Sequence, residues 1–179
     1  MEAADVGEGR CVLIDYAHNG VSLEHALRSL REYEPKRIIL VFGCGGNRDP
    51  HRRIEMGQAA AWLADLTIVT DDNPRWEPPE KIRKEITDAM DREIAKGAAG
   101  RYKVEPERRQ AIFRAVAECK EGDIVLIAGK GHECEQLAKG ERRYFSDRQE
   151  AELAARKQDL LGLKEKNREE QNIIMGEKT

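Results

Sequence analysis

The segment RIILVFGCGGNRD, residues 37–49, joins an uninterrupted apolar run to a glycine-rich polar loop. Arg37–Phe42 has no alternation of polar and apolar residues, which predicts a strand buried on both faces. Three glycines follow in the loop Gly43–Asp49, where they allow either a tight turn or the close approach of backbone N–H groups to an anion. A buried strand that ends in such a loop is typical of a parallel sheet with a ligand site at its edge.

Other apolar runs predict further strands, and helical patterns separate them. The strands are expected at Cys11–Tyr16, Leu66–Thr70, Arg101–Val104 and Asp123–Ala128, and the helices at Gly20–Tyr33, Arg52–Ala64, Pro79–Lys96 and Glu107–Cys119. This alternation predicts an α/β fold, with a mostly parallel sheet and helices on both faces.

The last third of the chain is expected to add a hairpin and a final helix. Glu135–Leu137 and Arg143–Phe145 flank a Lys139-Gly140 turn, and this hairpin is expected to supply one antiparallel edge strand. Ser146 is expected to begin the final helix. We expect one domain over residues 1–163 and a charged tail over residues 164–179 that is a frayed helix or disordered.

Composition excludes several classes of protein. The 179 residues are 36% charged with a formal net charge of −3, so there is no basic field to support nucleic-acid binding. No apolar run approaches the roughly 18 residues that a membrane span needs. Met1–Arg10 is acidic and polar, unlike a secretory signal, so a cytoplasmic location is expected. The four cysteines form no C-x-x-C pair, and no metal site is expected.

Polar loops follow four of the expected strands. Ligands of open α/β sheets bind beyond the carboxyl ends of the strands, so four such loops together predict a binding edge. Each loop alone has a simpler structural explanation, such as a helix cap at Asp15, ordinary loop positions at Tyr16 and His18, or a turn with a solvated Arg75. The loops are Asp15–His18, Gly43–Asp49, Asp71–Arg75 and Gly129–Glu133.

Two kinds of catalytic site are excluded by their missing motifs. Gly129-Lys130-Gly131 is reminiscent of a phosphate loop, but G-x-x-x-x-G-K-[ST] is absent from the chain, which excludes an autonomous P-loop ATPase. His132 and Glu133 lack the second histidine of H-E-x-x-H, which excludes a zinc protease of that type.

The loops as an ordered set resemble the C-terminal domain of the Mur ligases, in particular the type that adds meso-diaminopimelate to a peptidoglycan precursor. The motifs are DYAH at residues 15–18, VFGCGGNRD at 41–49, DNPR at 72–75, AGKGHE at 128–133 and FSDR at 145–148. The resemblance runs from about Arg10 to Leu163 and implies a Rossmann-like domain. It also implies that a UDP-sugar domain and a central ATPase domain complete the enzyme, and that these absent parts bind most of the ATP and the Mg²⁺.

The resemblance also implies roles for individual residues. The amino-acid site would comprise Arg48, Asp72, Asn73, Pro74, Arg75, Gly129 and Glu133, and the nucleotide would meet Asp15, Tyr16 and His18. Arg75 is suited to the second carboxylate of meso-diaminopimelate, because a guanidinium pairs with a carboxylate bidentately. Without the ATPase motifs, the chain is not expected to catalyse ligation alone, and no catalytic residue is assigned.

Departures from the family pattern leave other functions open. Asn19-Gly20 replaces the usual Thr-Pro, which is expected to loosen a turn, and Asn47 stands where aspartate is common. One alternative is a free-standing, non-catalytic module that binds diaminopimelate or regulates a ligase. Another keeps the fold with a different substrate, as in folylpolyglutamate or cyanophycin synthetases, although Asp72–Arg75 argues against it.

Overall fold

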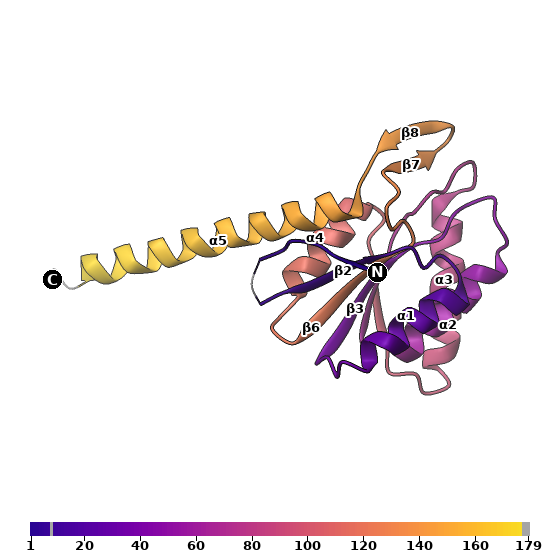
Figure 1. Cartoon of the computed structure of the whole chain (residues 1–179), viewed down its shortest axis with the longest axis horizontal. Helices are drawn as coiled ribbons and strands as arrows, with labels where there is room; N and C mark the ends of the chain where they lie inside the picture. Colours follow the sequence, from indigo (N-terminus) through magenta and orange to yellow (C-terminus); the bar gives the residue numbers. More distant parts are fainter. Residues whose placement is uncertain (8, 177–179) are drawn as a thin grey trace.

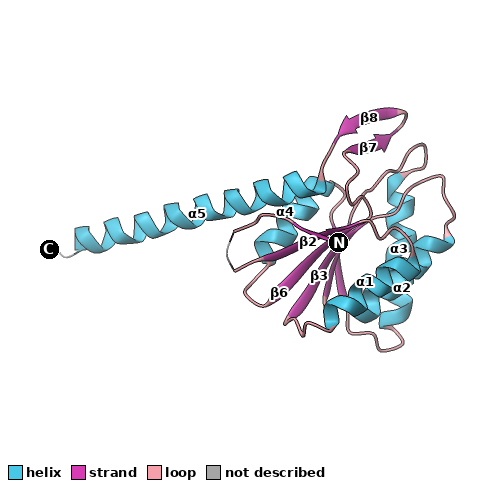
Figure 2. Ribbon diagram, viewed as in Figure 1, coloured by secondary structure: helices cyan, strands magenta, loops and turns pink. Residues whose placement is uncertain are grey.

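A twisted six-stranded sheet forms the centre of the protein (Figures 1 and 2). The computed structural model describes the backbone of residues 1–7 and 9–176, and the side chains of that range up to residue 163. The strand order is β1-β2-β6-β3-β4-β5, and all strands except β1 run parallel to one another. The strands are β1 (Glu2–Ala3), β2 (Cys11–Asp15), β3 (Arg37–Phe42), β4 (Leu66–Val69), β5 (Arg101–Val104) and β6 (Asp123–Ala128).

Helices cover both faces of this sheet, as expected. One face carries α1 (Gly20–Arg31), α2 (His51–Leu63) and α3 (Pro79–Ile94), and the other carries α4 (Arg108–Glu118) and the start of α5 (Asp147–Gly176). Ile38, Leu40 and Phe42 of β3 face the first layer, whereas Ile39 and Val41 face the second, and all five are fully buried. Burial of each such side chain contributes roughly 1.5–3 kcal/mol, which explains why this apolar run becomes the inner strand.

The predicted origin of the antiparallel edge strand was wrong. The hairpin β7 (Glu135–Ala138) and β8 (Glu141–Tyr144) forms a separate two-stranded sheet, and the antiparallel edge is β1 paired with β2. All four side chains of β8 are exposed, so this strand buries no face against the main sheet. Its backbone instead meets the loop after β4 through a bridge between Arg75 and Ala138.

The last helix leaves the body of the domain and extends away from it (Figure 1). Its first turns pack on α4 through Ala151, Ala154 and Ala155, which are buried. The helix continues to Gly176, so the backbone of 164–176 is helical; residues 177–179 of the expected tail lie outside the described residues. No helix in the described part of the chain is long and apolar enough to cross a membrane.

Candidate functional site

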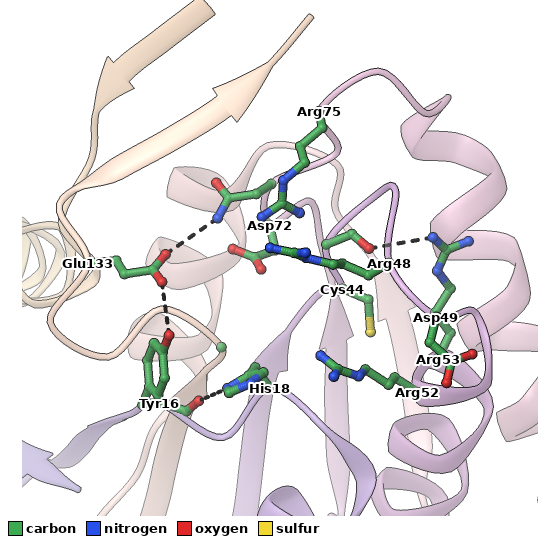
Figure 3. A pocket seen from close by; sticks show the side chains of 13 residues that line it. Tyr16, His18, Cys44, Arg48, Asp49, Arg52, Arg53, Asp72, Arg75 and Glu133 are labelled. Carbon is green, nitrogen blue, oxygen red and sulfur yellow. Dashed lines mark hydrogen bonds between the residues drawn. The ribbon is translucent and has the colours of Figure 1, made fainter. Parts of the chain in front are cut away.

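A cavity of about 330 Å³ opens at the carboxyl edge of the sheet. Loops after β2, β6, β3 and β4 reach it, and these are four adjacent strands in the sheet order. The first turn of α2 closes one side (Figure 3). The lining residues are Tyr16, His18, Cys44, Gly45, Arg48, Asp49, Arg52, Arg53, Asp72, Asn73, Arg75, Gly129 and Glu133.

Eight of the ten residues expected at a ligand site line this cavity. The two exceptions are Asp15 and Pro74. The Asp15 carboxylate accepts a hydrogen bond from the backbone N–H of Ala17 at 2.8 Å, which fixes the bend after β2. Pro74 lies against Gly46, where a Cβ atom would stand 2.0 Å from the Pro74 carbonyl oxygen. Both residues therefore shape the loops that carry the lining side chains.

Glycines in the loop after β3 allow it to touch the loop after β4. A Cβ on Gly43 would lie 2.1 Å from the carbonyl oxygen of Thr70, too close for any side chain. The N–H of Gly46 donates to the Asn73 carbonyl oxygen at 2.9 Å. Close packing of two loops thus accounts for these glycines, and it brings Arg48 and Arg75 to the same cavity.

The arginines of the cavity carry most of its positive charge. Arg75 has a left-handed backbone, with φ of 54°, and its Nη1 donates to the Gly46 carbonyl oxygen at 2.9 Å. Arg48, Arg52 and Arg75 form no ion pair with any side chain that the structure describes. Three guanidinium groups are therefore available for anionic groups of a ligand.

Glu133 brings a carboxylate to the opposite side of the cavity. Its two oxygens accept hydrogen bonds from the Tyr16 hydroxyl at 3.3 Å and from the Asn73 amide at 3.5 Å (Figure 3). The negative charge of Glu133 raises the pKa of Tyr16. The Tyr16 ring also meets the ring of His18 edge-on, with centroids 4.8 Å apart. The cavity thus offers both charge signs, as a zwitterionic ligand requires.

Residues 1–131 match the family described as "Mur ligase, glutamate ligase domain". The chain belongs to the Mur ligase family. It is 46% identical over 143 residues to the UDP-N-acetylmuramoyl-L-alanyl-D-glutamate--2,6-diaminopimelate ligase of Synechocystis, and 40% identical over 156 residues to the ligase of the same name from Geobacillus kaustophilus. These matches cover 80% and 87% of this Mur ligase chain but only 27% and 31% of the relatives.

A solved structure gives the same family relationship. A 2,6-diaminopimelate ligase superposes with a TM-score of 0.78 at 37% identity, over 86% of this chain and 30% of that one. E. coli FolC in complex with ADP superposes with a TM-score of 0.51 at 17% identity, over 90% of this chain and 31% of that one, which shows a shared fold alone. The mostly parallel, Rossmann-like sheet predicted from the sequence is thus confirmed as the fold of this Mur ligase chain.

Arg53 is a buried cation of the site that the sequence analysis missed. Its Nη1 and Nη2 donate to the two Glu77 oxygens at 2.8 and 2.7 Å, and Nη1 also donates to Glu85 at 2.6 Å. The hydrogen bonds from Arg53 hold the pKa of Glu77 at about 2. Arg53 repeats at helical spacing with the buried Met56, Gly57 and Ala60, a pattern that could have indicated its burial.

A second buried pair anchors α5 to the end of β6. Arg108 and Asp147 are both fully buried and share two hydrogen bonds of 2.7 Å. Burial disfavours the Arg108 cation, but the charge and hydrogen bonds of Asp147 outweigh this effect and raise the pKa of Arg108. Arg108 also donates to the Ala128 carbonyl oxygen at 3.0 Å, directly before the Gly129 loop. Asp147 of the FSDR motif thus holds Arg108, which in turn binds the backbone at the start of the Gly129 loop.

The expectation that Asn19-Gly20 loosens a turn was wrong. Asn19 caps α1: its side chain accepts from the N–H of Ser22 at 2.9 Å, and the Ser22 hydroxyl receives the Asn19 N–H in return. A Cβ on Gly20 would lie 2.3 Å from the Glu55 Cβ, so glycine allows α1 to approach α2 closely. The pair therefore gives α1 a capped start that packs closely on α2.

No cluster of His, Cys, Asp or Glu in the described part of the chain could hold a metal ion. Burial raises the pKa of the Cys44 thiol to about 12, so this cavity cysteine stays protonated and is a poor metal ligand. Mg²⁺ is held by oxygen ligands, and the described residues gather no carboxylate cluster of that kind.

Proposed function

We propose that this chain is the amino-acid-binding part of a ligase that adds meso-diaminopimelate to UDP-MurNAc-L-Ala-D-Glu. The observation that carries the proposal is the cavity with Arg48, Arg52 and Arg75 facing Glu133. Meso-diaminopimelate has two carboxylates and two amino groups, so the arginines would hold its carboxylates and Glu133 an ammonium group. Lysine lacks the second carboxylate and would leave one guanidinium of the cavity without its ligand partner, which disfavours its binding.

The residues of this chain would act by positioning the amino acid. ATP, bound mainly by other parts of the ligase together with Mg²⁺, would activate the carboxylate of the acceptor. The cavity would then hold the reacting amine of meso-diaminopimelate, unprotonated, in line with that carboxyl group. Tyr16 and His18 lie at the rim and are proposed to meet the nucleotide. A reaction that consumes ATP fits a cytoplasmic protein.

The roles of the remaining predicted residues follow from their places. Asp72 and Asn73 are buried in the loop after β4 and would orient the ligand. Gly129 has a φ of 116°, which favours glycine, and it turns the chain from β6 into the cavity loop. Residues 1–163 are proposed to form the functional domain. The curated relatives are about three times longer, which supports a ligase that also contains an ATPase part and a UDP-sugar part.

A chimeric ligase tests this function. Residues 1–163 would replace the matching part of the Geobacillus kaustophilus ligase, and amide formation would be measured with meso-diaminopimelate and with lysine. We expect ligation of meso-diaminopimelate and a loss of at least about 100-fold with lysine or after Arg75→Ala. Arg28→Ala, on an exposed ion pair of α1, is the matched control and should change the rate less than about twofold.

The unmodified Geobacillus ligase shows that the assay works, and size-exclusion chromatography shows that the chimera is assembled. An assembled chimera that uses lysine as well as it uses meso-diaminopimelate would contradict the proposed substrate. Retention of full activity after Arg75→Ala would contradict the proposed role of that arginine.

A further inference from the structure

Lys130 is fully buried directly after β6, although its side chain ends in a charge. Three oxygens lie within 3.0 Å of its ammonium group. Nζ donates to Asn73 Oδ1 at 2.9 Å and to the carbonyl oxygen of Glu135 at 2.7 Å. It also lies 3.0 Å from Asp72 Oδ1, outside hydrogen-bond geometry, so this third contact is an ion pair. A buried ammonium group needs such partners, and here they come from the loop after β4 and from the hairpin.

Lys130 and the backbone N–H of Leu137 together determine which way the Asn73 amide points. Asn73 Oδ1 accepts hydrogen bonds from Lys130 Nζ and from the backbone N–H of Leu137, the latter at 2.9 Å. Both of these groups are donors only, so they must face the oxygen of the amide and not its nitrogen. The Asn73 NH₂ group consequently points the other way, toward Glu133 at 3.5 Å and the cavity.

The same contacts hold the hairpin against the loop that carries Arg75. The backbone N–H of Arg75 donates to the Leu137 carbonyl oxygen at 3.1 Å. The Arg75 carbonyl oxygen accepts a hydrogen bond from the N–H of Lys139 at 2.6 Å. The side chain of Gln136 donates to the Asp72 carbonyl oxygen at 2.9 Å. Lys130 lies beneath this junction and is bonded to both segments.

We propose that Lys130 is a positioning residue that turns the Asn73 NH₂ donors toward the ligand and fixes the hairpin beside Arg75. An NH₂ group that faces the cavity can only donate hydrogen bonds, so it favours a hydrogen-bond acceptor on the ligand. Asn73 would therefore bind a carboxylate oxygen of the ligand next to the arginines. The identity of the ligand as meso-diaminopimelate rests on the proposed function, whereas the orientation of Asn73 does not.

Substitution of Lys130 tests the proposal in the full 179-residue chain. Lys130→Met removes the charge and all donors, and Lys130→Gln keeps two N–H donors without the charge. Lys84→Met, at an exposed ion pair of α3, is the matched control. Heteronuclear NMR would record the side-chain NH₂ signals of Asn73, assigned with Asn73→Asp, and hydrogen exchange at the Leu137 amide. The same samples would be titrated with meso-diaminopimelate.

In the ligand-free protein, we expect Lys130→Met to shift the Asn73 NH₂ signals and to speed exchange at Leu137 by at least about tenfold, which corresponds to about 1.4 kcal/mol. Lys130→Met should weaken meso-diaminopimelate binding about tenfold or more, and Lys130→Gln about threefold, since it restores part of the hydrogen bonding. Lys84→Met should change none of these quantities. In combination with Asn73→Ala, the effect of Lys130→Met on binding should largely disappear, because both act through one amide.

A folded Lys130→Met protein with unchanged Asn73 signals would overturn the proposal, and so would additive effects of the two substitutions on binding. If Lys130→Met does not fold, the natural chain still decides: free exchange at Leu137 would mean that its bond to Asn73 is not formed, and would overturn the proposal. Absence of binding by the natural chain would instead count against the proposed function, because the ligand-free measurements test Lys130 without a ligand.

Discussion

Replacing Arg53 with methionine tests how the loops around the cavity are held together. The Arg53 side chain is 1% exposed and bonds both oxygens of Glu77, which follows the DNPR loop, and one oxygen of Glu85 on α3. Removal of one partner of a buried ion pair costs about 3–5 kcal/mol. Glu77 and Glu85 are 15% and 31% exposed, and water can solvate them in the variant, so we expect the free energy of unfolding to fall by about 3 kcal/mol.

The dependence on pH gives an independent estimate. The folded-state pKa of Glu77 is about 2, below its ordinary value of about 4.3. A lowered carboxylate pKa contributes stability that is fully present above the unfolded-state pKa and is lost as pH falls toward the folded-state value. At 1.36 kcal/mol per pKa unit the contribution is at most about 3 kcal/mol, and screening by water reduces it.

Urea unfolding monitored by circular dichroism, at pH 7 and at pH 3, measures this effect. We expect Arg53→Met to lower the free energy of unfolding by about 3 kcal/mol at pH 7 and by clearly less at pH 3. Arg28→Met, at an exposed pair, serves as the control and should cost less than about 0.5 kcal/mol. A loss below about 1 kcal/mol at pH 7, or a loss of equal size at both pH values, would refute this reasoning.

Three further substitutions or reactions probe other parts of the site. Gly46→Ala should destabilise the chain by about 1–3 kcal/mol in urea unfolding, because its Cβ would overlap the Pro74 carbonyl oxygen; an unchanged midpoint would show that these loops are not in close contact. Asn19→Ala should lower the free energy of unfolding by about 1 kcal/mol through loss of the helix cap, measured in the same way, and an unchanged free energy would show that the cap does not stabilise α1. A thiol reagent at pH 8, followed by mass spectrometry, should label the exposed Cys134 and leave the buried Cys44 unmodified; equal labelling of both would contradict the burial of Cys44.

The inner strands were predictable from the sequence because a long apolar run has no other place than the core. The expected strands Arg37–Phe42 and Asp123–Ala128 coincide with β3 and β6. The order of the strands was not predictable, since the crossover that inserts β6 between β2 and β3 leaves no local pattern. The two-residue β1 was missed for a similar reason: it is defined only by its pairing with β2.

Buried charges were the main failure of the sequence analysis. Arg53, Arg108 and Lys130 are each less than 2% exposed, whereas charged residues are expected at the surface unless a partner is known. Their partners lie far away in the sequence: Lys130 is 57 residues from Asn73, and Arg108 is 39 residues from Asp147. Only the fold brings these pairs together, so no short motif could reveal which partner each buried charge has.

The meeting of four loops at one edge of the sheet was predicted and is confirmed by the cavity that they line. The rule that ligands bind beyond the carboxyl ends of parallel strands was sufficient for this step. Which ligand group each side chain contacts stays a prediction. Arg52 was included only in a predicted helix, and its place in the cavity depends on where α2 begins.

Titration of the isotope-labelled chain with meso-diaminopimelate, followed by NMR, tests the central claim most directly. We expect shifts confined to residues that line the cavity, and we expect these shifts to be lost with lysine or after Arg75→Ala. Arg28→Ala should leave them unchanged. Equal shifts with lysine and meso-diaminopimelate, or shifts that fall outside the cavity, would contradict the claim that this cavity binds the amino acid through its second carboxylate.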